Sequence, residues 1–513
     1  MNGQRTIMLS ELAEAVPGAR LEGEDLAVTG LAEDSRKVQQ ADLFVAARGR
    51  TVDGHDFAQE AVSRGAAAVV AERWLDLGVP VIVVADAARS VGPLAAAFWG
   101  HPAESLTMVA VTGTNGKTTT CSLLESILTE QGARPGVIGT VSYRYCGRVE
   151  PAPYTTPTAW LLHSMLAKMV EAGCTHGIME VSSHALDMGR VEGLTFDVAA
   201  FTNLTQDHLD LHGTMDAYFA AKQTLFRDHL DPDGVAVAWA DDPMAAQMVG
   251  AFSGMSLCCS ATDRQADIHV ETLKESLSGF SARVVTPRGA IEVQSKMLGR
   301  TNVANSLVAV GLALGLGIPP DVIGPGLSRC DRVPGRLEPV HHVQPGRPTV
   351  LVDYAHTPDA IEKVLATLRP LTKGRLMIVF GCGGDRDQTK RPLMGKAAAK
   401  GADLVVVTSD NPRTEDPGAI IDMALEGVVA TGMEHLDAER FGQADTGYVV
   451  QPDRGSAITL AIEAARDGDV VLIAGKGHED YQILGHDRIH FDDREQALAL
   501  LEALESRKAG GDR

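Results

Sequence analysis

Cysteine and long apolar runs are both in short supply in this chain of 513 residues. Its seven cysteines are scattered, apart from the adjacent Cys258 and Cys259, and no two have CxxC spacing. Zinc sites and disulfide frameworks use regular cysteine spacings, so the sequence predicts reduced thiols instead. The longest apolar run, residues 307–318, contains three glycines. It falls short of the roughly 20 residues that a membrane-spanning helix needs, and we expect a buried helix there.

Positive charge is also lacking. Lys and Arg number 46 against 67 Asp and Glu, which gives a formal net charge of −21. This balance argues against nucleic acid or an anionic membrane surface as a partner. Any anionic ligand must therefore be held by local clusters of basic side chains and backbone N–H groups. Glu11 and Glu14 interrupt any signal-peptide core near the N-terminus, so we expect a cytoplasmic protein.

The length and the apolar pattern predict three domains of the α/β class. At roughly 100–200 residues per domain, the chain is long enough for about three. Repeated alternation of strand-like and helical segments indicates mostly parallel sheets covered by helices. A Pro-Gly junction at residues 333–336 is typical of a domain boundary. We expect an N-terminal domain, a central phosphate-loop domain with a parallel sheet and a C-terminal Rossmann-like α/β domain, at residues 1–101, 102–336 and 337–513.

Individual elements can be placed where the apolar pattern is clear. The expected strands lie at residues 42–46, 81–84, 106–111, 177–181, 198–201, 349–353, 376–380, 404–408 and 470–474. The expected helices include residues 118–131 and 216–230, and residues 58–71 should form a helix that runs into a strand.

A glycine-rich turn joins the predicted strand 106–111 to the predicted helix 118–131. It contains Gly113, Thr114, Asn115 and Gly116, followed by Lys117, Thr118 and Thr119. Glycines let backbone N–H groups approach phosphate oxygens, and the helix N-terminus favours negative charge. Lys117 can reach the β- and γ-phosphates, and the Thr118 hydroxyl can bind Mg²⁺. The spacing is a shortened GxxGKT variant of the usual phosphate loop, and it predicts a nucleotide site.

Two residues near this loop are candidate metal ligands. Glu180 ends an apolar strand-like run, where a carboxylate can hold Mg²⁺ beside the phosphates. His208 lies in a segment rich in oxygen and nitrogen donors. A solvated acid and a histidine satisfied by a hydrogen bond are the alternative interpretations.

Lys222 lies on the apolar face of the predicted helix 216–230. It is four residues after Tyr218 and four before Phe226, a spacing that puts all three on one side. A free ammonium there is costly unless it pairs or extends to solvent. Carbamylation by CO₂ would instead give an anion that can bind Mg²⁺. Periodicity alone leaves both interpretations open.

Together these motifs resemble the ATP-dependent Mur ligase family over nearly the whole chain. The matching motifs are DSRKV (34–38), GTNGKT (113–118), EVSSH (180–184), TNLTQDH (202–208), YFAAK (218–222), NVAN (302–305), PGR (334–336), DYAHTP (353–358), GDRD (384–387), DNPR (410–413) and GKGHE (475–479). Each is modest alone, but the full set in order is specific.

The resemblance implies a role for each candidate residue. Lys222 matches the carbamylated lysine, and with Lys117, Glu180 and His208 it forms the catalytic group. Thr118, Glu180, His208 and Lys222 are the implied Mg²⁺ ligands, with ATP as co-substrate. The implied ATP contacts beyond the loop are Asn302, Arg336, Tyr354 and His356. The implied contacts to the UDP-sugar dipeptide are Glu33, Ser35, Arg50, Thr51, Val52, Tyr154, Thr155, Thr156, Ser182, Met188 and Arg190. Met188 replaces a glutamine of better-known members, and its thioether cannot donate a hydrogen bond.

The family resemblance also implies the amino acid. Asp410, Asn411, Pro412 and Arg413 match the signature of members that add meso-2,6-diaminopimelate, with Arg386, Gly475 and Glu479 as further contacts. This amino acid carries one more carboxylate than lysine, which Arg413 can bind with two hydrogen bonds. The implied reaction joins it to the D-Glu γ-carboxylate of UDP-MurNAc-L-Ala-D-Glu through an acyl phosphate, in peptidoglycan biosynthesis. The family also implies a monomer.

Three other interpretations are open to test. A lysine-adding homologue lacks the arginine of the DNPR motif. Folylpolyglutamate synthase or a ligase for D-Ala-D-Ala would share the phosphate loop but not the DNPR run or the Ser35 region. A phosphate-loop switch or transport ATPase would hydrolyse ATP without any UDP-sugar.

Overall fold

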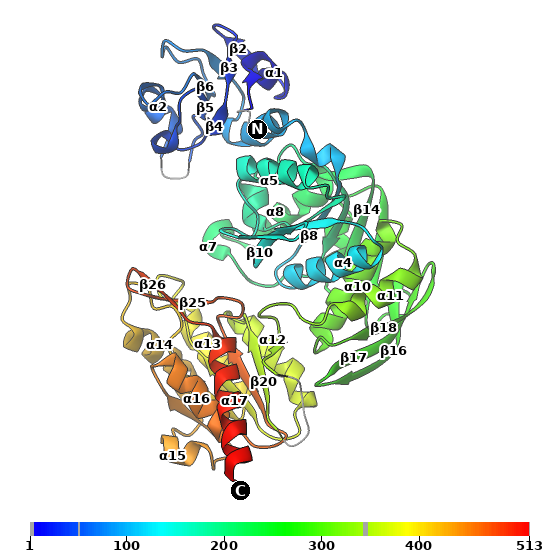
Figure 1. The fold of residues 1–513 in the computed structure, drawn as a ribbon, viewed down its shortest axis with the longest axis vertical. Helices are drawn as coiled ribbons and strands as arrows, with labels where there is room; N and C mark the ends of the chain where they lie inside the picture. The colour runs from blue at the N-terminus through cyan, green and yellow to red at the C-terminus, as the bar shows by residue number, and fades with distance from the viewer. Residues whose placement is uncertain (1–4, 50–51, 342–346, 512–513) are drawn as a thin grey trace. The chain divides into compact units, whose positions relative to one another are not determined.

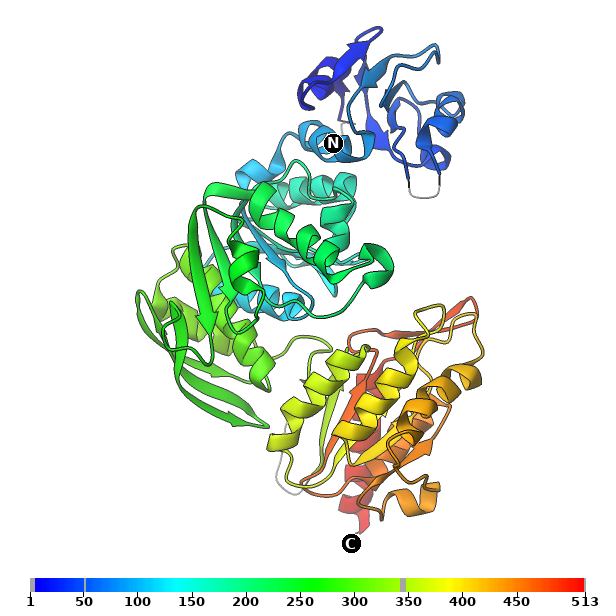
Figure 2. The ribbon, with the colours of Figure 1, turned by 180° about the vertical axis from the view of Figure 1, so that it is seen from behind.

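The computed structural model describes residues 5–49, 52–341 and 347–511 (Figures 1 and 2). The chain divides into two compact units, which we describe separately. Unit 1 extends to Val270 and includes Val285–Ile291 and Ala304–Gly326. Unit 2 comprises Glu271–Val284, Glu292–Val303 and the chain from Leu327 onward.

The N-terminal part of unit 1 is built on a five-stranded sheet. Its order is β2-β7-β6-β5-β4, with only the β2–β7 pair antiparallel. The strands are β2 (Arg20–Glu22), β4 (Gly30–Ala32), β5 (Asp42–Val45), β6 (Ala68–Ala71) and β7 (Val81–Val83). A short ribbon pairs β1 (Ile7–Met8) with β3 (Ala27–Val28). The helices are α1 (Leu9–Glu14), η1 (Ser35–Lys37), η2 (Gly54–Phe57), α2 (Ala58–Ser63) and α3 (Ala87–Trp99).

A sheet of eleven strands follows, in the order β11-β10-β9-β12-β8-β13-β14-β15-β16-β17-β18. From β9 to β16 neighbouring strands are parallel, and β10 and β11 are antiparallel. The strands are β8 (Thr107–Thr112), β9 (Pro135–Ile138), β10 (Ser142–Tyr145), β11 (Arg148–Pro151), β12 (His176–Glu180), β13 (Phe196–Phe201), β14 (Leu230–Trp239), β15 (Met255–Ser260), β16 (Ile268–Ser276), β17 (Gly279–Thr286) and β18 (Gly289–Ser295).

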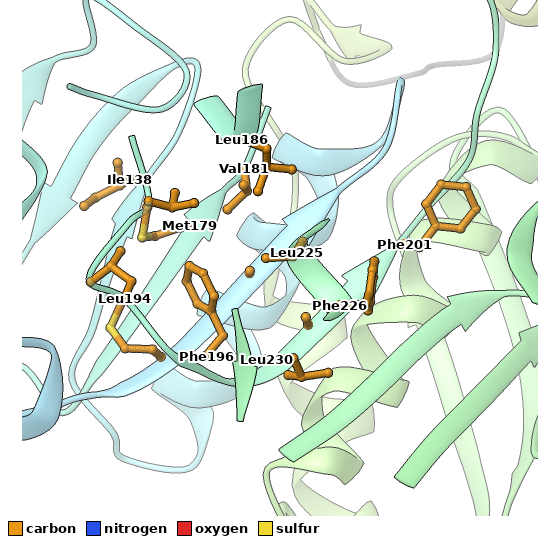
Figure 3. Close-up of a cluster of buried hydrophobic side chains, with 14 of the residues drawn as sticks. Ile138, Met179, Val181, Leu186, Leu194, Phe196, Phe201, Leu225, Phe226 and Leu230 are labelled. Atoms are coloured by element: carbon orange, nitrogen blue, oxygen red, sulfur yellow. The ribbon is translucent and has the colours of Figure 1, made fainter. Parts of the chain in front are cut away.

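Helices precede, connect and follow the strands of this sheet. They are η3 (Pro102–Ser105), α4 (Lys117–Glu130), α5 (Ala159–Glu171), α6 (Ser183–Asp187), α7 (Leu209–His212), α8 (Met215–Asp228), α9 (Ala245–Val249), α10 (Arg300–Gly315) and α11 (Pro320–Arg329). One buried cluster joins α8 to the sheet through Leu225 and Phe226, which pack near Phe196 and Phe201 of β13 (Figure 3). Buried apolar area is the main stabilising contribution here. It fixes the strand ends that carry the site.

The C-terminal sheet of unit 2 lies between two layers of helices. Its order is β19-β20-β24-β21-β22-β23, parallel except for β19. The strands are β19 (Glu338–Pro339), β20 (Thr349–Asp353), β21 (Leu376–Phe380), β22 (Leu404–Val407), β23 (Gly447–Val450) and β24 (Val470–Ala474), and β25 (Tyr481–Leu484) and β26 (Asp487–His490) form a separate hairpin. The helices are α12 (Pro358–Leu368), η4 (Arg369–Leu371), α13 (Lys390–Gly401), α14 (Pro417–Val429), α15 (Ala438–Phe441), α16 (Arg454–Ala464) and α17 (Asp493–Gly511).

Alternation along the strands explains the two layers. In β21, Ile378 packs in the cluster that contains α12, α13 and α14 residues, whereas Met377 and Val379 pack with α16 and α17. Figure 1 shows α16 and α17 on one face, and Figure 2 shows the other three helices on the opposite face. Both faces of the sheet are therefore buried, as expected for parallel strands.

The expected α/β class is confirmed, and so are most predicted elements. The strands at residues 349–353, 376–380 and 470–474 match β20, β21 and β24 residue for residue. The predicted strand 106–111 is shifted by one, because Thr112 is polar but still pairs with Phe201 in the ladder. The helix predicted from residue 118 begins at Lys117, directly after the left-handed Gly116.

The longest apolar run is a buried helix, as predicted. Residues 307–315 of the run form the second half of α10, where Leu307, Val310 and Leu314 are buried, and residues 316–318 follow the helix. Within the described ranges 5–49, 52–341 and 347–511, no helix has both the length and the apolar character to cross a membrane.

Candidate active site

The glycine-rich turn lies between β8 and α4, at the carboxyl end of the central strand. Gly113 has φ 144° and Gly116 has φ 87°, conformations that residues with a Cβ rarely adopt. A Cβ at Gly113 would lie 2.0 Å from Thr202 Oγ1, and one at Gly116 would lie 2.3 Å from Asn305 Oδ1. Both glycines are therefore required by backbone conformation and by close packing. Thr118 and Thr119 are buried in the first turn of α4.

The turn is held in place by the end of β13. The Asn115 carbonyl accepts hydrogen bonds from Thr202 Oγ1 at 2.6 Å and Asn203 Nδ2 at 3.1 Å. The Asn115 N–H donates to Asn203 Oδ1, and the Thr114 N–H donates to the Asn203 carbonyl. These bonds preorganise the loop for phosphate oxygens.

Two lysines donate to one carbonyl oxygen of this loop. Lys117 Nζ lies 2.9 Å from the Gly113 oxygen and 2.9 Å from the Thr114 oxygen. Lys222 Nζ, from α8, lies 3.0 Å from the same Gly113 oxygen. The structure thus brings together the predicted phosphate lysine and the predicted carbamylated lysine.

Lys222 is almost completely buried, with 1 % of its surface exposed. Its ammonium lies 4.5 Å from the centre of the Tyr218 ring, and Tyr218 OH is 3.1 Å from Thr114 Oγ1. Burial, together with the nearby Lys117 charge, holds the pKa of Lys222 well below its usual range, and Asp207 only partly offsets this. A lower pKa increases the share of the neutral amine at a given pH, and the neutral amine is the form that can react with CO₂.

Glu180 is the centre of a second group of contacts. It ends β12 with 1 % of its surface exposed. Its Oε2 accepts hydrogen bonds from Thr118 Oγ1 at 3.0 Å and from Thr140 Oγ1 at 2.9 Å, and its Oε1 accepts one from the Thr140 N–H at 2.8 Å. The predicted pair of Thr118 and Glu180 is thus in direct contact. Their oxygen donors are the type that Mg²⁺ prefers.

His208 lies in a different group, beside Lys222. Its φ is 54°, and its ring packs edge-on against His184 at 4.6 Å and against Tyr218 at 6.2 Å. Burial lowers the pKa of His208 to about 4, helped by His184 and the two lysines and opposed by Asp207. Its ring is therefore neutral at pH 7.

Among the described residues, no three His, Cys, Asp or Glu side chains gather as a metal site. The oxygen donors present that fit Mg²⁺ are those of Glu180 and Thr118.

The residues expected at the dipeptide end surround Glu180. Thr155 Oγ1 is 3.0 Å from Thr140 Oγ1, and Thr156 Oγ1 donates to the Glu180 carbonyl at 2.7 Å. Ser182 caps α6 by accepting from the Ala185 N–H. The structure therefore brings these predicted residues to the Glu180 edge of the sheet.

Arg190 organises the neighbouring segment. It donates to the Thr156 carbonyl at 2.9 Å, and its guanidinium lies 5.1 Å from the Tyr154 ring. Met188 is 48 % exposed, and its Sδ accepts from Arg190 Nη2 at 3.5 Å. The methionine thus contacts the arginine without supplying the donor that a glutamine would have.

The remaining unit 1 candidates belong to the N-terminal sheet region. Ser35 is buried at the start of η1, and its Oγ donates to Glu60 Oε2 at 3.4 Å. Glu33 and Val52 are exposed. The predicted contacts Arg50 and Thr51 lie outside the described residues.

In unit 2, three of the predicted ATP contacts lie together. Arg336 lies 4.8 Å from the Tyr354 ring, and the His356 ring lies 4.5 Å from it. Burial raises the pKa of Tyr354 to about 12. The fourth predicted contact, Asn302, is buried near the start of α10 and donates to the Leu298 carbonyl. The aromatic rings and the Arg336 cation around Tyr354 suit a planar, anionic ligand such as a nucleotide.

The residues predicted to bind the amino acid lie where β21, β22 and β24 end. Asn411 Nδ2 donates to Glu479 Oε2 at 2.9 Å, and a Cβ on Gly475 would lie 2.7 Å from Asp410 Oδ2.

Arg413 has φ 51°, and its Nη1 donates to the Gly384 carbonyl at 2.7 Å. A Cβ on Gly384 would in turn meet the Pro412 oxygen. Arg386 is exposed and donates to the Asp385 carbonyl, so it contributes a cation at the rim.

Four contributors were missing from the predicted set. Thr140, Tyr218, Lys476 and Arg454 make the contacts that orient the predicted residues. Tyr218 and Lys476 lie within motifs already quoted, so their positions were available. Thr140 and Arg454 lie outside every motif, and only the folded chain reveals them.

Comparison with known proteins gives a consistent family. Three family models match: "Mur ligase family, catalytic domain" over residues 27–109, "Mur ligase middle domain" over residues 111–313, and "Mur ligase, glutamate ligase domain" over residues 335–477.

Curated relatives match almost end to end. A UDP-N-acetylmuramoyl-L-alanyl-D-glutamate–2,6-diaminopimelate ligase of Gloeobacter violaceus is 47% identical, covering 95% of this chain and 96% of its own. The enzyme of the same name from Geobacter sulfurreducens is 44% identical, covering 97% and 99%.

Solved structures agree with these relatives. A structure of a protein with that name is 34% identical, with TM-score 0.67, and covers 93% of this chain and 95% of its own. A MurF ligase from Thermotoga maritima in complex with ADP, 20% identical with TM-score 0.59, covers 93% and 98% and shares the fold.

Proposed function

Because this chain belongs to the Mur ligase family, we propose that it is an ATP-dependent ligase of peptidoglycan synthesis. It adds meso-2,6-diaminopimelate to the D-Glu γ-carboxylate of UDP-MurNAc-L-Ala-D-Glu. The observation that carries this proposal is Lys222, a buried amine 3.0 Å from the phosphate-loop oxygen of Gly113. A motor or transport ATPase has no evident use for a buried second lysine there.

The reaction is proposed in two steps. The γ-carboxylate attacks the γ-phosphate of ATP, which gives an acyl phosphate and ADP. The amine of diaminopimelate then attacks the acyl carbon, and phosphate leaves. Lys117 and the loop N–H groups offset the repulsion between the carboxylate and the phosphates.

Lys222 is proposed to carry a carbamate. Its neutral amine attacks CO₂, a nitrogen–carbon bond forms and one proton leaves. Thr118, Glu180, His208 and this carbamate would hold Mg²⁺. The ion, when bound, neutralises phosphate charge and polarises the transferred phosphoryl group. The carbamate, held near phosphates, is reasonable only if it faces a cation.

Arg413 is proposed to select the amino acid. Its guanidinium can bind the far carboxylate of diaminopimelate with two hydrogen bonds, whereas lysine offers no such group. Asp410, Asn411, Gly475 and Glu479 lie beside it, and Arg386 adds charge. Glu479 is proposed to bind an ammonium group of the amino acid.

The remaining substrate contacts and the domain boundaries are proposed from the same family membership. The UDP end is assigned to Glu33, Ser35, Arg50, Thr51 and Val52. The dipeptide is assigned to Tyr154, Thr155, Thr156, Ser182, Met188 and Arg190. Domains at residues 1–101, 102–336 and 337–513 would each hold one reactant. We further propose that the enzyme works in the cytoplasm as a monomer.

The test is phosphate release with each substrate omitted in turn, with the product identified by mass. We expect release only when ATP, Mg²⁺, the UDP-sugar dipeptide and diaminopimelate are all present, with formation of the tripeptide. Equal phosphate release without the UDP-sugar would favour the ATPase alternative.

A further inference from the structure

Lys476 is a fully buried lysine, between two glycines of the turn after β24. Its side chain has no exposed surface. Gly475 and Gly477 both have positive φ, at 117° and 53°, which lets the turn place a long side chain inward. A buried ammonium is costly unless every donor is matched.

The partners of Lys476 include the residues assigned to the amino acid. Its Nζ donates to the Tyr481 carbonyl, to Asn411 Oδ1 at 3.4 Å and to Glu479 Oε2 at 3.5 Å. Asp410 Oδ1 lies 3.9 Å away. An ammonium has three donors, and these three acceptors account for them.

This network fixes the orientation of the Asn411 amide. Asn411 Oδ1 accepts from Lys476 and from the Ile483 N–H at 3.0 Å. Both are donors only, so the oxygen must face them and the NH₂ group must face Glu479. Asn411 Nδ2 accordingly donates to Glu479 Oε2 at 2.9 Å.

A buried ion pair also supports the turn that carries Lys476. Arg454 donates to both oxygens of Asp493 at 2.7 Å, and neither side chain is exposed. The same guanidinium donates to the carbonyls of Ser409 and Ala474. These two residues directly precede Asp410 and Gly475, so the two motifs are held at a fixed separation.

We propose that Lys476 is a positioning residue for the amino-acid substrate, acting on Glu479 both directly and through the Asn411 amide that donates to it. It keeps the Glu479 carboxylate oriented to receive the ammonium of the incoming diamino acid. This inference rests on the proposed function and adds the residue that orients its amino-acid site.

The experiment compares steady-state constants of Lys476→Met with the wild-type protein. A lost hydrogen bond to a charged group corresponds to roughly a 10- to 100-fold effect. We expect the KM for diaminopimelate to rise by that factor, with the KM values for ATP and the UDP-sugar dipeptide within about twofold. Lys363→Met is the matched control, because Lys363 is half-exposed on α12 and pairs with Asp359. It should change none of the three.

The double variant Lys476→Met/Glu479→Gln separates positioning from general support of the fold. It removes the Lys476 ammonium and the Glu479 carboxylate together. No unpaired buried charge is then left, so this variant is the one to measure if Lys476→Met alone does not fold. We expect its KM for diaminopimelate to equal that of Glu479→Gln. A further tenfold rise, or an equal rise in all three KM values of Lys476→Met, overturns the inference.

The two proposals fail in distinguishable ways. Ligation by the wild-type protein with an unchanged diaminopimelate KM in Lys476→Met overturns only the role of Lys476. Absence of ligation by the wild-type protein overturns both.

Discussion

At the scale of single residues, the phosphate loop places two lysines on one oxygen. Lys117 and Lys222 both donate to the Gly113 carbonyl. Two ammonium groups this close repel each other, and burial adds to the cost for Lys222. Losing a proton relieves that repulsion, and forming a carbamate would convert it into attraction.

Replacing Lys222 tests this directly. Lys222→Ala should lower kcat by roughly a thousandfold, because a group that stabilises transition-state charge is lost. Labelled CO₂ should give a carbamate signal in the carbon NMR spectrum of the wild-type protein and none in the variant. Lys168→Ala is the control, since Lys168 is half-exposed beside Glu150. A variant with full activity, or a carbamate signal that persists in it, would contradict the assignment.

Sequence reasoning succeeded at residues where a pattern exists. The four-residue spacing from Tyr218 placed Lys222 on the apolar face of its helix, and the structure shows that the side chain is buried there rather than extended to solvent. Lys476 offered no such signal, because it lies between glycines in an aperiodic turn. Its partner Asn411 is 65 residues away, a contact that only the parallel order of β22, β21 and β24 creates.

At the scale of elements, the glycines at the two ends of α4 distinguish the effect of a left-handed backbone from the effect of a close side-chain contact. Gly116 and Gly132 have nearly equal φ values, 87° and 86°. Gly116 faces Asn305 at close range, whereas nothing lies within 4 Å of a Cβ at Gly132. Both substitutions to alanine should cost about 1–2 kcal/mol of stability from the left-handed backbone.

Only Gly116→Ala should also disturb the loop. We expect about a hundredfold loss in kcat/KM for ATP, because displacing a phosphate site by about 1 Å has that effect. Gly132→Ala should leave kcat/KM within about twofold at a temperature where both variants are folded. Similar kinetic losses in the two variants would show that strain, rather than the Asn305 contact, sets the loop.

Helix α5 contains a histidine that should make the fold sensitive to acid. His163 is fully buried, burial lowers its pKa to about 4, and its Nδ1 has no hydrogen-bond partner among the described residues. The unfolded chain binds a proton near the ordinary pKa of 6.5. The contribution of the neutral, buried His163 to the free energy of unfolding is therefore complete above pH 6.5 and is lost as the pH falls toward 4.

His163→Leu should remove about 3 kcal/mol of this pH dependence. Trp160, on the same helix and packed against Phe98 and Trp99, provides a fluorescence signal for unfolding in urea at pH 7 and pH 4. The exposed His486→Gln is the control. If the two variants lose stability equally between those pH values, His163 does not contribute as argued.

Elements were easier to predict than their ends. Apolar runs located β20, β21 and β24 to the residue, because both faces of that sheet are buried. Beyond such runs, hydrogen bonding decides where an element stops, as at Thr112. A polar residue that continues a ladder gives no hydrophobic signal.

At the scale of the whole molecule, an acidic chain is proposed to bring together two anionic reactants, ATP and the UDP-sugar dipeptide, and an amino acid that carries two carboxylates. The net charge of −21 opposes this. Local arrangements must therefore overcome it: the loop N–H groups and Lys117 in unit 1, and Arg336, Arg413 and Arg386 in unit 2. Lys117 and Arg336 are the cations proposed to serve ATP, and Arg413 and Arg386 are those proposed to serve the amino acid.

The most direct test of the central claim is a competition for the amino-acid site. Equal concentrations of meso-2,6-diaminopimelate and L-lysine would be supplied with ATP, Mg²⁺ and UDP-MurNAc-L-Ala-D-Glu, and the tripeptide products separated by mass. A site built to bind the extra carboxylate should favour diaminopimelate by at least about a hundredfold, and Arg413→Ala should reduce that preference. Equal amounts of the two products from the wild-type protein would contradict the account of Arg413, and no tripeptide at all would contradict the ligase itself.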